Sequence, residues 1–352
     1  MLPALLVFAG IFFAISMFKT KNNIERRTNP DLAVLKEGWT GNIVADGKFY
    51  DETSPRSVPL GDILKWQFDR KAQRTEKRSD TFRVQVQPFD CSSMPENSIV
   101  WLGHASFMIN AGGIRLITDP CFFNLPSGRR KVALPAPAGS LKPIRYMLVS
   151  HDHRDHFDKR SVRTLLDNNP NIEVLLPLGG SRLLGGKAFG GVARQEAGWW
   201  QEYKLKDNLR IIFLPAKHWG RRGLNDFNKT LWGSFLIIAG DTKIFFAGDT
   251  AYDGRIFKEI KELFGEMDIC LFPIGAYSPP FIMQKAHANP EEAVRAFLDL
   301  GGKRLIPMHY GTYDLSDEPP GEPVARLLEC ADKARIGERI EVLAVGQEYV
   351  WR

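Results

Sequence analysis

The segment from His151 to His156 constrains this chain more than any other part of its sequence. It reads His-Asp-His-Arg-Asp-His and directly follows the apolar run 145–150, which is typical of a buried strand. Enzymes built from strands and helices place their chemistry in the loops that follow strands. The spacing H-x-H-x-D-H therefore predicts a metal site, and the alternative is a solvated, histidine-rich turn.

The ligand types in this segment narrow the kind of metal site. A single structural zinc is usually closed by four ligands, often including cysteine, and leaves no open position. Several imidazoles and a carboxylate within six residues suit two adjacent ions better than one. Imidazole and carboxylate ligands favour a zinc, iron or manganese site over a thiolate site.

Length and composition restrict the number of domains and the class of protein only loosely. The 352 residues can form one large domain or two smaller ones, and either can bury an ample core. With 44% apolar and 25% charged residues, the composition is that of a globular protein. The four cysteines lie far apart and form no Cys-x-x-Cys pair, so they indicate neither a disulfide framework nor a zinc ribbon.

The first 18 residues are strongly apolar and carry no charged side chain. As a helix they would reach roughly 27 Å, about the hydrocarbon thickness of a bilayer. They predict a transmembrane anchor or a cleaved signal segment. The cations that follow, Lys19, Lys21, Arg26 and Arg27, favour the cytoplasmic side for the rest of the chain. We therefore expect a membrane-associated protein.

Residues 19–97 are interpreted as an N-terminal extension. Residues 19–60 are polar and turn-rich and predict a tether, and 60–71 predict a short amphipathic helix. Between Lys65 and Arg83 the chain has seven Lys or Arg against three acids. Such a basic surface attracts phosphate groups, either of lipids or of nucleic acids, although a solvated helix face is the alternative.

From residue 98 to residue 352, short apolar runs alternate with turns and helical segments. Strands are predicted at 99–102, 107–110, 114–118, 145–150, 173–177, 210–214, 234–239, 243–247, 269–273 and 304–307. Helices are predicted at 159–166, 256–264, 290–300 and 323–333. This pattern indicates an α/β domain in which helices cover the sheets.

Three later segments and one earlier segment end a predicted strand with a potential ligand. The later ones contribute His218, Asp249 and His309, and the earlier one contributes His104. Each alone is weak evidence, because a lone histidine after a strand is more often an ordinary loop residue. Together with the 151–156 segment they account for six of the seven histidines, so we interpret them as one site.

These segments resemble the metallo-β-lactamase superfamily, and within it the N-acyl-phosphatidylethanolamine-hydrolysing phospholipase D family. The resemblance extends from about residue 60 to about residue 345. It is carried by H-x-H-x-D-H and by Trp-Leu-Gly-His-Ala (101–105), Thr-Asp-Pro (118–120), His-Trp (218–219), Leu-Trp-Gly-Ser (231–234), Phe-Phe-Ala-Gly-Asp-Thr (245–250), Pro-Ile-Gly-Ala-Tyr (273–277) and Asn-Pro-Glu-Glu-Ala-Val (289–294). It implies a four-layer αββα sandwich with a dinuclear metal site.

The resemblance also implies a set of ligands. One zinc would be held by His151, His153 and His218, and the other by Asp155, His156 and His309. Asp249 would bridge both, because a shared carboxylate offsets the repulsion between two cations. A water between the ions would lose its proton near neutral pH and attack phosphorus as hydroxide. Asp155 and Asp249 are thus predicted to be catalytic as well as ligating.

Other residues receive supporting roles. His287 resembles a family residue at the mouth of the active site and is predicted to bind a phosphate oxygen or to protonate the leaving alkoxide; the alternative is a surface histidine. His104 and Asp119 are predicted to orient the ligands by hydrogen bonds. Tyr277, Phe281 and Met283 are predicted to contact an acyl chain, with ordinary core packing as the alternative.

The leading hypothesis is a phospholipase D-type phosphodiesterase with two Zn²⁺ per chain, which cleaves N-acyl-phosphatidylethanolamine to phosphatidic acid and N-acylethanolamine. Iron or manganese could replace zinc. Its expected partners are a phospholipid substrate, a membrane surface and a second copy of the chain in a homodimer. Nucleic acid is not expected, because no RNA-binding module is evident. The alternatives are a lactonase or similar hydrolase of a soluble metabolite, and a non-catalytic membrane envelope protein with a vestigial metal site.

Overall fold

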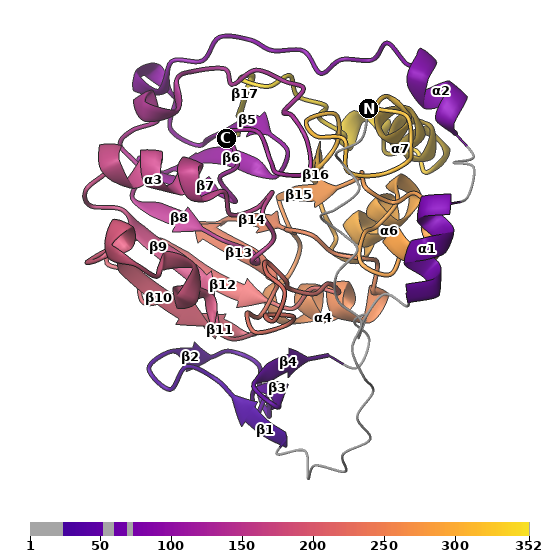
Figure 1. The fold of residues 1–352 in the computed structure, drawn as a ribbon. Coiled ribbons are helices and arrows are strands. Elements are labelled where there is room, and N and C mark those ends of the chain that lie inside the picture. The colour runs from indigo at the N-terminus through magenta and orange to yellow at the C-terminus, as the bar shows by residue number, and fades with distance from the viewer. Residues whose placement is uncertain (1–23, 52–59, 69–72, 352) are drawn as a thin grey trace.

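Two large β-sheets face each other at the centre of the protein and helices cover their outer faces (Figure 1). The structure, a computed structural model, describes residues 24–51, 60–68 and 73–351. Each large sheet has seven strands within these residues, and a third sheet has three.

The first large sheet has the strand order β10-β9-β8-β7-β6-β5-β17. Neighbouring strands are parallel from β10 to β7 and antiparallel from β7 to β17. The bounds are β5 Ser98–Gly103, β6 Ser106–Ala111, β7 Ile114–Thr118, β8 Tyr146–Leu148, β9 Glu173–Pro177, β10 Ala193–Ala197 and β17 Glu348–Val350.

The second large sheet has the order β16-β15-β14-β13-β12-β11-β2. Here β14, β15 and β16 are parallel and the remaining pairs are antiparallel. The bounds are β2 Ala33–Val34, β11 Gln201–Glu202, β12 Arg210–Leu214, β13 Ser234–Ala239, β14 Thr242–Phe246, β15 Ile269–Pro273 and β16 Arg304–Met308.

Side-chain alternation along the strands divides the core into layers. On β5, Ile99 and Trp101 join a cluster that includes Phe213 and Phe235 of the second sheet. Val100, between them in sequence, joins a separate cluster with α3. Successive strand residues point to opposite faces, so one face of the first sheet packs on the second sheet and the other on α3.

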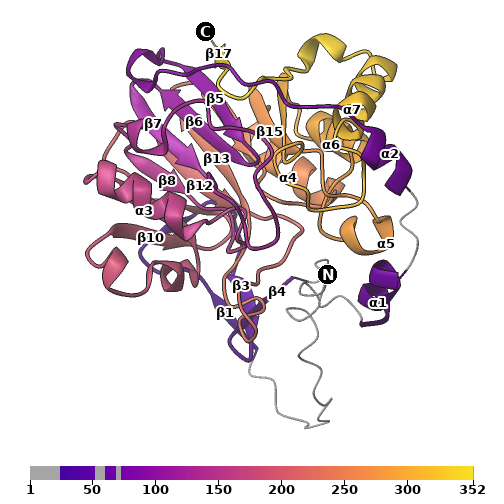
Figure 2. The same ribbon diagram turned by 45° about the horizontal axis from the view of Figure 1, so that its top comes forward.

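Helices complete the outer layers. Helix α3 (Lys159–Asn168) covers the first sheet, and Asp158 caps it by accepting the N–H groups of Arg160 and Ser161 (Figure 2). The helices packed with the second sheet in the core cluster are α4 (Gly254–Phe264), α6 (Pro290–Asp299) and α7 (Glu322–Lys333). The four-layer αββα arrangement predicted from the sequence is therefore confirmed.

Most predicted elements form close to their expected bounds. The predicted strand 145–150 is shorter, because regular pairing stops at Leu148 and the chain then turns into the histidine-rich segment. Helix α1 occupies Leu60–Phe68, and α2 (Arg74–Ser79) and α5 (Pro280–Met283) are further short helices.

Residues 24–51 are folded onto the domain, whereas the sequence indicated a tether. They form β1 (Ile24–Arg27), β2, β3 (Asn42–Ala45) and β4 (Lys48–Tyr50). Phe49 is 1% exposed and belongs to the main core cluster, and its N–H donates to the carbonyl of Asn228. Strands of two to four residues give too short a periodic pattern to be recognised in the sequence.

The membrane localisation predicted from the sequence requires correction. Within the described residues no helix has the length and apolar character needed to cross a bilayer. The longest of them, α7, has 12 residues, which is about 18 Å of helix, against a hydrocarbon core of about 30 Å. The apolar segment 1–18, on which the prediction rested, lies outside the described residues.

If residues 24–51 are part of the folded domain, Phe49→Ala will destabilise the whole domain. We expect a loss of about 3–5 kcal/mol in the free energy of unfolding, as for other buried Phe→Ala changes, measured by urea denaturation. Phe68→Ala is the control, because Phe68 is 82% exposed. Equal stability of the two variants would mean that this segment does not contribute to the core.

Candidate metal centre

The predicted ligands lie where strands of both large sheets end. The segment 151–156 follows β8 in the first sheet, and His218, Asp249 and His309 follow β12, β14 and β16 in the second. His104 lies in the turn between β5 and β6. In open α/β sheets, sites form outside the carboxyl ends of the strands. The structure brings all these side chains together.

Gly248 allows the two sheets to approach at this point. Its φ is +59°, and a Cβ at this position would lie 2.7 Å from the Cβ of Ser150. A side chain would therefore be strained and would collide with the first sheet. The glycine before Asp249 thus lets this carboxylate reach the segment 151–156.

One group of ligands consists of His151, His153 and His218 with Asp249, and their potential ligand atoms all lie within 4.8 Å of one another. The Nδ1 atom of His153 is 2.9 Å from Nε2 of His151 and 3.2 Å from Nε2 of His218. This is the group predicted to hold one metal ion.

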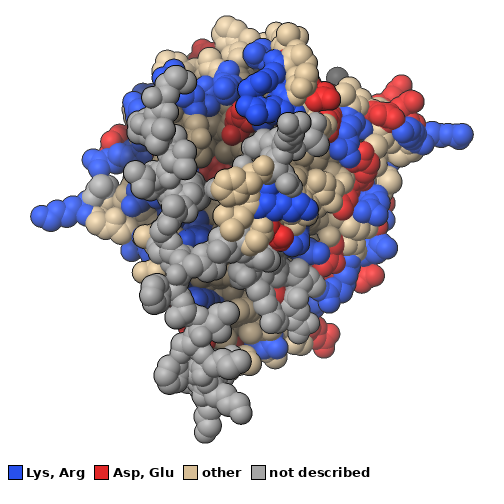
Figure 3. All heavy atoms as spheres, turned by 45° about the vertical axis from the view of Figure 1, so that its right-hand side comes forward, with Lys and Arg blue, Asp and Glu red and all other residues tan. Residues whose placement is uncertain are grey.

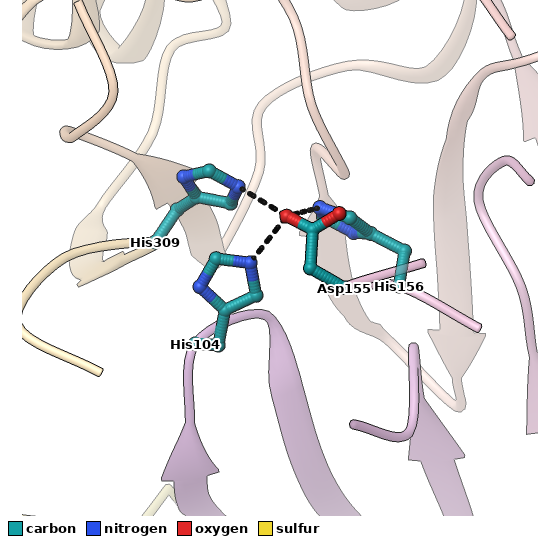
Figure 4. Close-up of side chains that lie close together, drawn as sticks. All are labelled: His104, Asp155, His156 and His309. Atoms are coloured by element: carbon teal, nitrogen blue, oxygen red, sulfur yellow. Dashed lines mark hydrogen bonds and ion pairs between the residues drawn. The ribbon is translucent and has the colours of Figure 1, made fainter. Parts of the chain in front are cut away.

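A second group consists of Asp155, His156 and His309, and it also includes His104 (Figure 4). The Oδ2 atom of Asp155 is 2.9 Å from Nε2 of His104, 3.6 Å from Nε2 of His156 and 3.7 Å from Nε2 of His309. His104 was predicted to orient a ligand by a hydrogen bond, and its Nε2 is within hydrogen-bond distance of Asp155. The same nitrogen also lies among the potential ligand atoms of this group.

Asp249 lies between the two groups. Its Oδ1 is 3.1 Å from Nε2 of His309 and its Oδ2 is 3.1 Å from Nε2 of His156. The same Oδ2 is 3.9 Å from Nε2 of His151 and 3.8 Å from Nε2 of His218. This is the position that a carboxylate shared between two ions would occupy.

The electrostatic environment keeps the carboxylates ionised. Burial alone would raise the pKa of Asp249, but His156, His309 and His287 together hold this pKa well below its usual range. Burial lowers the pKa of His151 and of His218, so both imidazoles are neutral. Ionised carboxylates and neutral imidazoles are the forms that bind metals.

Two imidazoles show the opposite shift in the absence of a cation. Burial alone would lower the pKa of His309, but the carboxylates of Asp249 and Asp155 raise this pKa to about 9. The carboxylates also raise the pKa of His156, which burial alone would lower. Metal binding must therefore displace protons from these two rings.

Several buried polar atoms in the site lack a hydrogen-bond partner among the described residues. They include Nε2 of His156, Nε2 of His309 and Oδ1 of Asp249. The short contacts between His309 and Asp249 are thus ion pairs without hydrogen-bond geometry. Buried polar atoms are costly when unsatisfied, and coordination to a metal would satisfy them. Nitrogen and oxygen donors without thiolate fit zinc, iron or manganese.

Residues outside the predicted ligand set contact the histidine rings and hold them in their orientations. Asp119, as predicted, contacts a ligating ring: its Oδ2 is 2.7 Å from Nδ1 of His156. Ser150 Oγ donates to Asp119 Oδ2 over 2.6 Å and lies 2.9 Å from Nδ1 of His151. Ser150 was not singled out from the sequence, although it directly precedes His151. The Nδ1 atom of His218 is 2.9 Å from the carbonyl oxygen of Ala286.

The loops that carry His104 and His309 hold each other across the two sheets. The N–H of His309 donates to the carbonyl of His104 over 3.1 Å, and the two ring centroids are 4.0 Å apart. Both residues have positive φ, +55° and +63°, which is uncommon for residues other than glycine. Such backbone strain persists only where the surroundings enforce it, and it is frequent at functional sites.

A cavity of about 1450 Å³ opens onto His104 and His309. Of the predicted acyl-contact residues, Met283 lines this cavity, together with Ile282. Tyr277 and Phe281 do not line it: the Tyr277 hydroxyl donates to Glu322 over 2.6 Å, and the ammonium of Lys65 lies 4.8 Å from the ring centroid of Phe281.

His287, which was predicted to lie at the mouth of the active site, lies close to Asp249. Its Nδ1 is 3.7 Å from Oδ2 of Asp249, and this buried nitrogen has no hydrogen-bond partner among the described residues. Burial lowers the pKa of His287 to about 4. The ring is therefore neutral at pH 7.

Comparison with known proteins identifies the family. A model of the β-lactamase superfamily domain matches residues 115–310. The N-acyl-phosphatidylethanolamine-hydrolysing phospholipase D 1 of Caenorhabditis elegans is 31% identical over 264 residues, 71% of this chain and 74% of that protein. The mitochondrial enzyme of the same description from Saccharomyces cerevisiae is 32% identical over 237 residues, 64% of this chain and 50% of that protein.

A solved structure supports the fold. A metallo-hydrolase from the archaeon Ignicoccus hospitalis matches with a TM-score of 0.55 and 19% identity, over 72% of this chain and 99% of that one. The resemblance recognised in the sequence is therefore confirmed, and this chain is a metal-dependent hydrolase of the β-lactamase superfamily.

Proposed function

We propose that the protein is a dinuclear zinc phosphodiesterase of phospholipase D type, which hydrolyses N-acyl-phosphatidylethanolamine to phosphatidic acid and N-acylethanolamine. The observation that carries this proposal is the convergence of two ligand groups on one carboxylate, Asp249, below a large cavity. The similarity to two phospholipases of that description gives the substrate class its support.

In this proposal the ligands divide as the two groups suggest. His151, His153 and His218 would hold one ion, and Asp155, His156 and His309 would hold the other. Asp249, which lies near imidazoles of both groups, would be shared by the two ions. The ions would supply a hydroxide nucleophile near neutral pH and Lewis acidity toward the phosphate oxygens. Asp119 and Ser150 fix the directions of the His156 and His151 rings.

His287 is placed to bind a phosphate oxygen. Because its ring is neutral at pH 7, it offers one N–H donor and no full positive charge. This favours a hydrogen bond to the phosphate, one of its two predicted roles, over protonation of the leaving alkoxide.

The cavity suits an amphiphilic anion. Its apolar lining includes Trp66, Trp219, Leu224, Phe227, Ile282 and Met283, and its cations are Arg74, Lys77, Arg78, Arg83, Lys131, Arg221 and Lys285. Figure 3 shows the side of the molecule that carries α1 and α2, where Lys and Arg side chains gather in the upper part. Apolar walls beside cations fit a lipid with a phosphate headgroup.

The acids of the cavity are engaged by the protein itself. Glu318 accepts the N–H groups of Ala276 and Ser278 over 2.6 and 3.0 Å. Asp314 pairs with Lys77. The lining has seven Lys and Arg side chains against four carboxylates, so the cavity keeps an excess of positive charge even with these acids counted.

The substrate prediction can be tested with the purified full-length chain. We expect it to release N-acylethanolamine from N-acyl-phosphatidylethanolamine in detergent micelles, measured by mass spectrometry, and to leave a panel of acyl lactones largely intact. Turnover of a lactone without release of N-acylethanolamine would replace the proposal by a lactonase.

The metal arrangement predicts the outcome of removing the shared carboxylate. Elemental analysis of the wild-type chain should give close to two ions. Asp249→Asn should lower this number and reduce turnover by about 100-fold or more, because the ions lose their common anionic ligand. Asp241→Asn, at an exposed turn before β14, is the matched control. Full turnover by Asp249→Asn, or a wild-type chain without metal, would refute the mechanism.

Asp119 contacts the ring of His156 and is not a predicted ligand. Its substitution should therefore impair metal binding less than Asp249→Asn does. Replacing such supporting residues commonly weakens metal binding by about 10–100-fold. We expect Asp119→Asn to show a loss of this size in competition titrations with a chelator. Asp167→Asn, an exposed carboxylate on α3 paired with Arg163, should bind metal as the wild type does. Unchanged affinity in Asp119→Asn would show that Asp119 has no part in orienting the ligand.

A further inference from the structure

A second cavity, of about 540 Å³, lies next to the segment 151–156 but is lined by different side chains from the first. Its walls come from the connection after β7, the start of α3 and the loop after β12. Its lining is Phe122, Phe123, Asn124, Leu125, Pro126, Arg130, Val132, Ala133, Leu134, Arg154, Asp158, Lys159, Arg160 and Arg222.

The charges of this lining are unbalanced. It contains five cationic side chains and one carboxylate, and that carboxylate, Asp158, is engaged as the cap of α3. Nearby arginines have anionic partners: Arg163 pairs with Asp167, and Arg182 with Asp152 and Asp226. Within the described part of the chain, no carboxylate forms an ion pair with Arg154, Arg160 or Arg222.

The arginines are held in place by neutral groups. Arg222 Nη1 lies 3.2 Å from the carbonyl oxygen of Asp152 and 3.4 Å from that of His153. Arg154 Nη2 donates to the carbonyl of Arg222 over 3.1 Å. The guanidinium of Arg160 lies over the ring of Phe123, 3.8 Å from its centroid. These contacts order the side chains, and none of them is with a carboxylate.

Two of these cations destabilise each other. Arg154 and Arg222 line the same cavity, and like charges that share one cavity repel each other. Arg130 is less available to a ligand, because all three of its guanidinium nitrogens donate to carbonyl groups, those of Val132, Cys121 and Leu102. A bound anion would therefore relieve the repulsion mainly at Arg154, Arg160 and Arg222.

We propose that this second cavity binds a phosphate-class oxyanion, either inorganic phosphate or the phosphate end of a small organic monoester, through Arg154, Arg160 and Arg222. Guanidinium groups present paired N–H donors that match phosphate oxygens. The apolar remainder of the lining, which includes Phe122, Leu125 and Val132, has room for an organic substituent.

Binding at this site would also act on the metal centre. Arg154 lies within the ligand segment, and Arg222 holds the carbonyls of Asp152 and His153. The loop 219–227 borders both cavities, since Trp219 and Arg221 line the first and Arg222 lines the second. An anion between Arg154 and Arg222 thus fastens the ligand segment to this loop, whatever substrate the enzyme hydrolyses.

The test is calorimetric titration of inorganic phosphate into the metal-loaded, full-length protein at low ionic strength. We expect two binding events, because the metal centre also binds phosphate. Asp249→Asn should remove the metal-centre event, and Arg160→Gln should weaken the other about tenfold or more. Arg163→Gln removes a positive charge from the same helix outside the cavity, and it should leave both events unchanged.

Further variants and ligands separate the remaining outcomes. A combined Arg154→Gln/Arg160→Gln variant should abolish the second event while the midpoint of thermal unfolding verifies that the protein is folded. Tighter binding of phenyl phosphate than of inorganic phosphate would identify an organic monoester, and equal binding would identify free phosphate. A single event that disappears in Asp249→Asn, or two events that the arginine variants leave unchanged, would overturn the proposal.

Discussion

The position of Asp249 between two clusters of imidazoles is the constraint on which the rest of the site depends. A buried carboxylate is costly in isolation, but the surrounding rings hold it in its ionised form. Its oxygens reach ligands from both large sheets. The glycine before it, the short β13–β14 hairpin and the close approach of Ser150 all serve to bring this one side chain to the junction of the sheets.

Much of the candidate site could be predicted, because the residues that point to it lie in short segments of the sequence. Each predicted ligand follows an apolar strand, and strands that run in the same direction in one sheet end at a common edge. The ligand that His104 contacts could not be read in this way, because its closeness to Asp155 depends on how the β5–β6 turn meets the segment after β8. Tyr277 was likewise misleading. An aromatic residue after a strand can turn toward a cavity or away from it, and a hydrogen bond to Glu322 turns it away.

The fold likewise has parts that could be predicted from the sequence and parts that could not. Strands and helices with clear periodicity were predicted within a few residues, and the αββα layers follow from their order. The strands within residues 24–51 were missed because they are short and bind by long-range pairing, as β2 does with β11. The side chain of Gln201 in β11 accepts the N–H of Asn29 and donates to its carbonyl. Polar contacts of this kind leave no hydrophobic pattern in the sequence.

The hydrogen bond between the loops of His104 and His309 connects the two large sheets at the candidate metal site. Ligands contributed by separate sheets can bind an ion only when the sheets are correctly packed, so part of the ion's binding free energy holds the sheets together. Metal affinity and sheet packing then report on the same equilibrium. A substitution between the sheets, such as one at Phe213 or Phe235, would lower the metal affinity although neither residue is a predicted ligand.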